Sequence, residues 1–316
     1  MRLRAAIAAL MLLALPAHAD APPAAVAPLD RDHPLAGRIW STAEHRFLGP
    51  DELVARAAKA DAVILGETHD NPDHHALQAW MLRRLTAGGR APWVAFEMID
   101  ASQRQALDQA LANRPVDTVA LGEALRWKQN GWGDWDRYRP IAEAAVAAGA
   151  TVVPANLSRD DTMALGRGES PDLAARLGID LPLSPDEQAV MAEEIKASHC
   201  GELPDRAVPP MVRIQRARDA AMAEAMADGI TRGRQAVLIA GAGHARSDRG
   251  VPRALARLTP NARMLSLAFT EVEPGQTDPA TYDQAFDALW FTPRAEREDP
   301  CIAFRRHMEK KGEKSP

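Results

Sequence analysis

Short apolar runs rich in β-branched residues alternate with helical patterns along this chain, and this alternation constrains its fold more than any other feature. Apolar residues recur at helical spacing between the first runs, in residues 72–89 and 101–114. Runs that are apolar throughout fit strands buried on both faces, and parallel strands need helical crossovers between them. The runs occupy residues 61–67, 92–98, 150–157, 234–243 and 262–269. The sequence therefore predicts an α/β fold with a mostly parallel sheet flanked by helices.

The middle of the chain follows a different pattern. Residues 160–233 lack such runs but contain two helix-like segments, 184–199 and 209–229, set apart by Pro and Gly. We expect a smaller all-helical insertion here, between the third and fourth strands, where it could form a lid over one edge of the sheet. The α/β domain then comprises residues 36–159 and 234–305, and a charged tail follows at 306–316.

Residues 1–19 have the pattern of a secretory signal peptide, with two arginines, an unbroken apolar run, and small residues at Ala17 and Ala19. The run is shorter than the roughly 20 residues that cross a bilayer, which disfavours an N-terminal membrane anchor. We expect cleavage after Ala19, a periplasmic location, and a Pro- and Ala-rich flexible leader at 20–35. Because no cysteine stands near the cleavage point, no direct lipid anchor to the membrane is expected.

The charge balance argues against one class of partner. The chain has 38 Lys plus Arg against 43 Asp plus Glu, a formal net charge of −5, and loss of the two signal-peptide arginines makes this −7. Proteins that bind nucleic acids carry basic surfaces, so no nucleic-acid partner is expected.

Two cysteines, Cys200 and Cys301, remain in the mature chain. In an oxidising compartment an even count favours one disulfide, which here would close a loop of about 100 residues. The alternative is two separate thiols, either of which could ligate a metal or haem.

Polar side chains gather where the predicted strands end. In open parallel sheets ligands bind beyond the carboxyl ends of the strands, so these residues are the first candidates for a site. The residues are Glu67 and His69 after the first run, Glu97 in the second, Asn156 and Arg159 after the third, and His244 and Arg246 after the fourth. We expect them to form one functional rim.

Two further histidines lie in the first turn of the helix that follows the first strand. Asn71 and Pro72 mark the start of this helix, since Asn caps free N–H groups and Pro fits the first turn. His74 shares a face with apolar residues three and seven positions later, which turns it inward. His74 and His75 are therefore either part of the rim or ordinary core or capping histidines.

Several chemistries could use this rim. Imidazoles and carboxylates are ligands for zinc or another divalent metal, which could activate water. Imidazole or tyrosinate can instead hold haem iron. Glu67 or Glu97 could act as a general base if burial raises its pKa. Because no tight metal-spacing motif such as H-E-x-x-H is present, residue types alone leave these alternatives open.

Residues 126–141 hold three of the seven Trp and one of only two Tyr. This concentration is typical either of a flat ligand face or of a Trp-anchored loop that packs on the sheet. Tyr138 is a candidate because a phenolate is a known type of haem ligand. Arg137, Arg139 and Arg246 could pair with carboxylates such as propionates.

Eight ordered sequence blocks between Arg38 and Cys301 resemble the ChaN family of haem-binding proteins in the Tiki superfamily. The blocks are LGETHDNPDHH, AFEM, YRPIAEAA, PANLSR, HCGELP, QRARDAAMA, AGAGHARSDRGVP and DPC. The resemblance implies a parallel sheet with a smaller helical domain, export, haem as cofactor, and a role in haem or iron uptake. It also implies a tyrosine ligand, for which Tyr138 is the candidate, and a homodimer that holds two facing haems. Family members are often lipoproteins, a pattern from which this chain departs.

The blocks are also similar to Tiki proteases and erythromycin esterases, and this likeness supplies the alternative hypothesis. In the first hypothesis the chain is an exported haem-binding protein. Its cofactor-binding residues are then His69, His74, His75, Tyr138, Arg159, His244 and Arg246. In the alternative it is a metal-dependent hydrolase of a peptide or ester, with Glu67 and Glu97 catalytic. Zinc or another divalent metal would then be held by Glu67, His69, Glu97 and His244.

Overall fold

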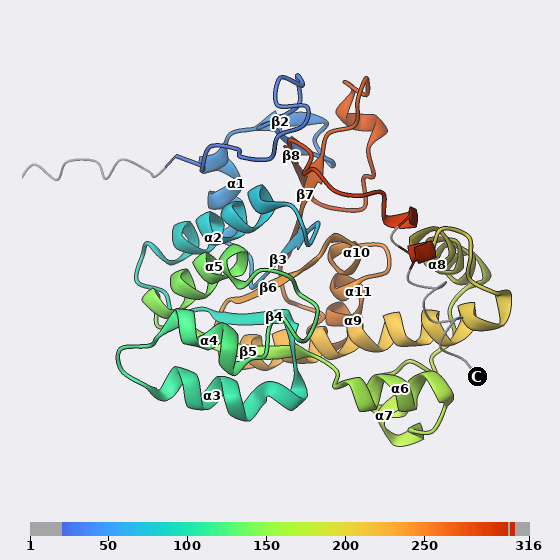
Figure 1. Cartoon of the computed structure of the whole chain (residues 1–316). Helices are drawn as coiled ribbons and strands as arrows, with labels where there is room; N and C mark the ends of the chain where they lie inside the picture. The colour runs from blue at the N-terminus through green and yellow to red at the C-terminus, as the bar shows by residue number, and fades with distance from the viewer. Residues whose placement is uncertain (1–20, 303, 307–316) are drawn as a thin grey trace, which may run out of the picture.

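The structure, a computed structural model, describes residues 21–302 and 304–306 (Figure 1). The predicted signal peptide with its cleavage site, and all but the first residue of the predicted charged tail, lie outside these residues. Within the described part, no helix combines the length and the apolar character needed to cross a membrane.

One eight-stranded sheet with the strand order β2-β1-β8-β7-β3-β6-β4-β5 forms the centre of the molecule. All five predicted strands are present, and they pair in parallel. Their bounds are β3 Ala62–Glu67, β4 Trp93–Asp100, β5 Thr151–Asn156, β6 Ala236–Gly241 and β7 Met264–Glu271. Every residue of β3 and β6 is buried, which explains why these strands are apolar apart from Glu67 at the end of β3.

Three further strands extend one edge of the sheet and were not predicted. β8 (Ala288–Thr292) pairs in parallel with β7, whereas β1 (Ile39–Ser41) and β2 (Arg46–Leu48) are antiparallel. β1 and β2 have three residues each, too few for an alternating or apolar pattern to stand out. The sheet is therefore mostly parallel, as expected, with an antiparallel edge.

Helices cover both faces of the sheet, as the alternation of strand side chains requires. Val63 and Leu65 of β3 point to a core shared with the helices that precede β5, while Ala62 and Ile64 point to a second core on the opposite face. The first face is covered by α1 (Pro50–Ala57), α2 (Pro72–Thr86), α3 (Arg104–Ala112), α4 (Thr118–Ala124) and α5 (Trp135–Ala147). The second is covered by α10 (Ala242–Ala245), α11 (Val251–Leu258) and part of α9 (Val208–Thr231).

The segment between β5 and β6 is helical, and its first part forms a lobe beside the sheet (Figure 1). The lobe consists of α6 (Arg159–Arg167), α7 (Pro171–Arg176), α8 (Pro185–Ser198) and the first half of α9, around two small apolar cores. The second half of α9 leaves the lobe and packs on the sheet through Met222, Ala223 and Met226. One continuous helix thus belongs to both parts. Short 3-10 helices lie at Ala101–Gln103, Asp205–Ala207 and Pro279–Thr281.

A disulfide joins Cys200, just after α8, to Cys301 near the end of the described chain, with the two Cα atoms 5.5 Å apart. Of the two alternatives for the cysteines, pairing is therefore the one confirmed. The bond ties the helical lobe to the segment that follows β8.

The segment predicted to be a flexible leader is held against the body of the protein from Val26 onward. The carboxylate of Asp73, in the first turn of α2, accepts hydrogen bonds from the backbone N–H of Val26 (2.7 Å) and of Ala27 (3.2 Å). Leu29 forms a β-bridge with Arg294, and the side chains of Ala27 and Leu35 are buried. The Pro- and Ala-rich composition predicted a flexible segment. Composition does not show that Asp73, far along the chain, accepts hydrogen bonds from the backbone of this segment.

Candidate functional site

The strand order places three strand ends side by side at the carboxyl edge of the sheet. β6 lies between β3 and β4, so Gly241 at the end of β6 stands between Glu67 at the end of β3 and Glu97 in β4. The N–H of Gly241 donates to Oε2 of Glu97 at 2.7 Å. The predicted convergence of these strand ends is therefore present.

Glu67 is the centre of one group of side chains, which we call the Glu67 cluster: Glu67, His69, His75 and Tyr138. The Glu67 side chain is fully buried, and its Oε1 accepts hydrogen bonds from Nδ1 of His69 (2.9 Å) and the hydroxyl of Tyr138 (2.8 Å). Nε2 of His75, on α2, lies 2.7 Å from its Oε2. His69 is the accessible member, with 43% of its side chain exposed, and its ring packs edge-on against Trp132.

Glu97, His244 and Asp219 form a second group, the Glu97 cluster. Nδ1 of His244 lies 2.6 Å from Oδ1 of Asp219, and its Nε2 lies 3.3 Å from Oε1 of Glu97. All three side chains are at least nine-tenths buried. The imidazole is thus enclosed between two carboxylates, one from β4 and one from α9.

The two clusters meet at Gly241. A Cβ at this position would lie 3.0 Å from Nε2 of His69 and 3.6 Å from Oε2 of Glu97. Only a glycine lets the His69 ring approach the backbone this closely without displacing it.

Burial and charge oppose each other in the Glu67 cluster. Burial raises the pKa of Glu67, but the positive charge of His75 and the hydrogen bond from His69 outweigh it and lower the pKa to about 2. For His69, burial lowers the pKa, and the hydrogen bond to Glu67 with the charge of Glu97 raises it overall. Burial and the charge of Glu67 raise the pKa of the Tyr138 phenol far above its usual range. The cluster therefore contains an ionised carboxylate and a neutral phenol at neutral pH.

The Glu97 cluster holds a protonated imidazole. Burial lowers the pKa of His244, but the charges of Glu97 and Asp219 outweigh this and raise it to about 10. Burial raises the pKa of Glu97, whereas His244 and His69 lower it to about 2. Burial also raises the pKa of Asp219, and there His244 only partly offsets it. Two carboxylates share one imidazolium, so together the three groups carry a net negative charge. This explains why the pKa of Asp219 is raised although that of Glu97 is lowered.

Stability should fall on the alkaline side of neutrality as His244 loses its proton. Folding raises the pKa of His244 from 6.5 to about 10, so its contribution is fully present below pH 6.5 and is lost as pH rises through 10. Urea unfolding at several pH values across this range measures the effect. The variant His244→Gln should lack this alkaline loss, and the same slope in wild type and variant would contradict the assignment.

Three predicted site residues do not reach the clusters. His74 is buried, where its Nδ1 accepts from the N–H of Thr68 (2.8 Å) and its Nε2 contacts the hydroxyl of Thr292 (2.8 Å). Burial lowers the pKa of His74 to about 3, so it is a neutral histidine that fixes the loop after β3. Arg246 pairs with Asp248 and Asp283, and Arg159 is exposed at the start of α6.

Tyr138 and His75, which were expected to bind a cofactor, belong to the Glu67 cluster and are buried. The Tyr138 ring is fully buried and lies 4.0 Å from the His75 ring, centroid to centroid. The other tyrosine, Tyr282, is 6% exposed, and its hydroxyl accepts from Glu273 and donates to Gln276. His244 is equally enclosed. Of the predicted ligand histidines, only His69 is accessible.

Two site residues were missed from the sequence. Asp219 was not singled out, although it shares one face of α9 with Met222, Ala223 and Met226 at helical spacing, all of them buried. A lone acid on such an apolar face indicates a buried partner, which here is His244. Trp132 lies in the Trp-rich stretch, but nothing in the sequence connected it with His69.

The four residues predicted to hold a metal are arranged as acid–imidazole pairs. Each carboxylate is engaged by a histidine, Glu67 by His69 and Glu97 by His244. Within residues 21–302 and 304–306, no group of three or more His, Cys, Asp or Glu side chains is arranged to hold a metal ion. The geometry therefore does not support the alternative of zinc or another divalent metal.

Comparison with known proteins identifies the family. A family model described as haem-binding uptake, Tiki superfamily, ChaN, matches residues 53–255, which is more than half of the chain. No curated protein matches the chain. Among solved structures, the ChaN protein of Campylobacter jejuni, described as binding haem cofacially, is 21% identical with a TM-score of 0.66. That match covers 80% of this chain and 95% of the other, and it confirms the α/β fold.

Two further structures show weaker likeness. The type III effector HopBA1 is 17% identical, with a TM-score of 0.44 and coverage of 77% of this chain and 92% of its own. A mutant of the erythromycin esterase EreC, in its open conformation, is 12% identical, with a TM-score of 0.42 and coverage of 83% and 99%. On the family match, this chain belongs to the ChaN family of haem-binding uptake proteins within the Tiki superfamily.

Proposed function

We propose that this protein is exported and binds haem for haem or iron uptake, with His69 as the ligand of the iron. The observation that carries the proposal is the family match, to which the structure adds one accessible imidazole at the carboxyl edge of the sheet. The signal-peptide pattern in residues 1–19 supports the exported location.

The surroundings of His69 suit an iron ligand. Its Nδ1 faces the carboxylate of Glu67, so in the neutral ring Nδ1 carries the proton and Nε2, which lies beside Gly241, keeps its lone pair. Metal-binding histidines generally donate their second N–H to a carboxylate or carbonyl in this way, which fixes the ring and makes it more basic. His69 would hold the haem, whose iron would take an imidazole nitrogen as a ligand.

Trp132 extends the site beyond the imidazole. It packs edge-on against His69, with 5.2 Å between the ring centroids, and offers an apolar surface beside the imidazole ring. The related Campylobacter jejuni protein binds haem cofacially. By analogy we propose that two copies of this chain, each with its own His69, pair when haem is bound.

Titration of the purified mature protein with hemin tests this proposal. We expect a Soret shift that saturates at one haem per chain in wild type and is lost in His69→Ala, because the iron then has no axial nitrogen. His45→Ala, an exposed histidine of the β1–β2 turn, is the matched control and should bind as wild type does. Tyr138→Phe should also keep the shift, since its phenol is buried and bonded to Glu67. Loss of haem in Tyr138→Phe but not in His69→Ala would refute the ligand assignment.

A second candidate function, hydrolysis of a peptide or ester, is favoured by one specific arrangement. The accessible His69 is oriented by a buried carboxylate, and the Glu97 cluster stands on the other side of Gly241. An imidazole oriented in this way can act as a general base toward water. Turnover of p-nitrophenyl esters by wild type, abolished in His69→Ala and unaffected by chelators, would support this function. Equal rates in wild type and variant would remove it.

A further inference from the structure

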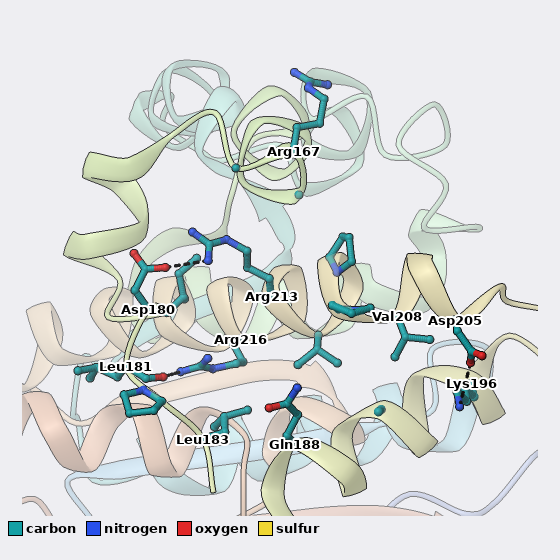
Figure 2. Close-up of a pocket in the computed structure, with 18 residues that line it drawn as sticks. Arg167, Asp180, Leu181, Leu183, Gln188, Lys196, Asp205, Val208, Arg213 and Arg216 are labelled. Carbon is teal, nitrogen blue, oxygen red and sulfur yellow. Dashed lines mark hydrogen bonds and ion pairs between the residues drawn. The ribbon is translucent and has the colours of Figure 1, made fainter. Parts of the chain in front are cut away.

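The helical lobe contains a cavity of about 780 Å³ whose lining includes no member of the Glu67 or Glu97 clusters (Figure 2). It lies between the end of α6, the loop that leads to α8, and the first half of α9. One wall is apolar, formed by Ile179, Leu181, Leu183, Val208 and Val212. Its volume falls within the range of roughly 300–1,000 Å³ that is typical of small-molecule sites.

The cavity is basic, although the protein as a whole is acidic. Four cationic side chains line it, against two carboxylates: Arg167, Lys196, Arg213 and Arg216, with Asp180 and Asp205. Three of the cations are paired with acids. Arg213 bonds Asp180 at 2.7 Å, Lys196 lies 3.3 Å from Asp205, and Arg167 bonds Glu169 at 2.7 Å.

Arg216 is the cation of this cavity whose hydrogen-bond partner is a neutral carbonyl. Its guanidinium donates to the carbonyl oxygen of Leu181 at 2.7 Å, as Figure 2 shows, and among the described residues it forms no ion pair. Burial lowers its pKa, the neighbouring charges of Arg257 and Arg213 lower it further, and the charges of Asp180 and Glu187 only partly offset this. The Arg216 guanidinium is partly buried and lies near the guanidinium groups of Arg213 and Arg257. Binding of an anion next to it would therefore stabilise its charged form.

From the size of the cavity, its apolar wall and Arg216, which forms no ion pair among the described residues, we propose that the cavity binds a small amphipathic carboxylate. The carboxylate pairs with Arg216, and the hydrocarbon body covers the wall formed by Leu181, Leu183 and Val212. Because the other three cations already have acidic partners, the cavity is matched to a single negative charge rather than to a polyanion. This site is independent of haem binding at His69.

Isothermal titration with decanoate, below its micelle concentration, tests the proposal on the full mature chain. We expect one decanoate per protein, and no heat of binding with decyltrimethylammonium, which has the same chain and the opposite charge. Arg216→Met keeps the length of the side chain but removes its charge, so affinity should fall about 10- to 100-fold. Arg232→Met, an exposed arginine near the end of the same helix, is the matched control and should bind as wild type does.

A second variant protects the test if Arg216→Met does not fold. Ala192→Trp, on the α8 side of the cavity, adds a large side chain to its lining and should also abolish binding. Unchanged affinity in either folded variant, or no binding by wild type, would overturn the proposal. Displacement of decanoate by one equivalent of hemin would also overturn it, because the cavity would then be the haem site. Absence of a Soret shift alone contradicts only the proposed function.

Discussion

Replacing His244 by alanine should lower the free energy of unfolding by about 3–5 kcal/mol, the cost of removing one partner from a buried ion pair. His244 is the cation between two buried carboxylates, those of Glu97 and Asp219. Without it, Asp219 loses its cationic partner and Glu97 keeps only the more distant charge of His69. Urea unfolding at pH 7, followed by circular dichroism, measures the change.

The matched control for this variant is Arg246→Ala, two residues further along the chain. Arg246 pairs with Asp248 and Asp283, whose side chains are about half exposed. The Arg246 side chain is 14% exposed, but the two acids that it leaves are open to water, so this variant should lose much less stability than His244→Ala does. If both variants lost the same small amount of stability, the result would contradict a protonated His244 that stabilises the carboxylates of Glu97 and Asp219.

Removal of the disulfide is expected to have the second largest effect, a loss of about 2–4 kcal/mol. The bond joins residues 101 positions apart, so in the unfolded chain it closes a long loop. The chain-entropy model gives a ceiling of ~4.7 kcal/mol for a loop of about 100 residues. The variant with both Cys200→Ser and Cys301→Ser should therefore unfold at lower urea concentration than oxidised wild type.

Addition of a reducing agent provides the control. It should shift the unfolding midpoint of wild type toward that of the double variant and leave the double variant unchanged. Hydrogen exchange should increase chiefly in α8 and the segment after β8, which the bond connects. A midpoint that does not move on reduction would show that the cross-link adds no stability.

The parallel centre of the fold could be predicted because its strands are buried on both faces and their residues are therefore mostly apolar up to the strand ends. β3 and β6 are the clearest cases, with every residue buried. Strand order could not be predicted, because β6 enters between β3 and β4 only through contacts far apart in the chain. The short edge strands β1 and β2 carry too few residues for any periodicity.

The site was predicted in outline because polar residues at the ends of buried strands are conspicuous. Glu67, His69, Glu97 and His244 do converge around Gly241. The sequence could not predict which of these side chains are exposed to solvent, because this depends on how helices distant in the chain pack. Tyr138 and His75 occupy the inner side of the cluster and His69 the outer side, a distinction set by α5 and α2.

Helix α9 is one continuous helix that packs in the lobe at its start and on the sheet at its end. Its 24 residues span about 36 Å at the usual rise of 1.5 Å per residue. Arg216 and Asp219 are about one turn apart on this helix. Arg216 in the cavity lining and Asp219, which is hydrogen-bonded to His244, are therefore expected to move as one rigid unit. A tilt of the lobe would therefore be transmitted to the Glu97 cluster as a change in the Asp219 to His244 distance, with no hinge in between to absorb it.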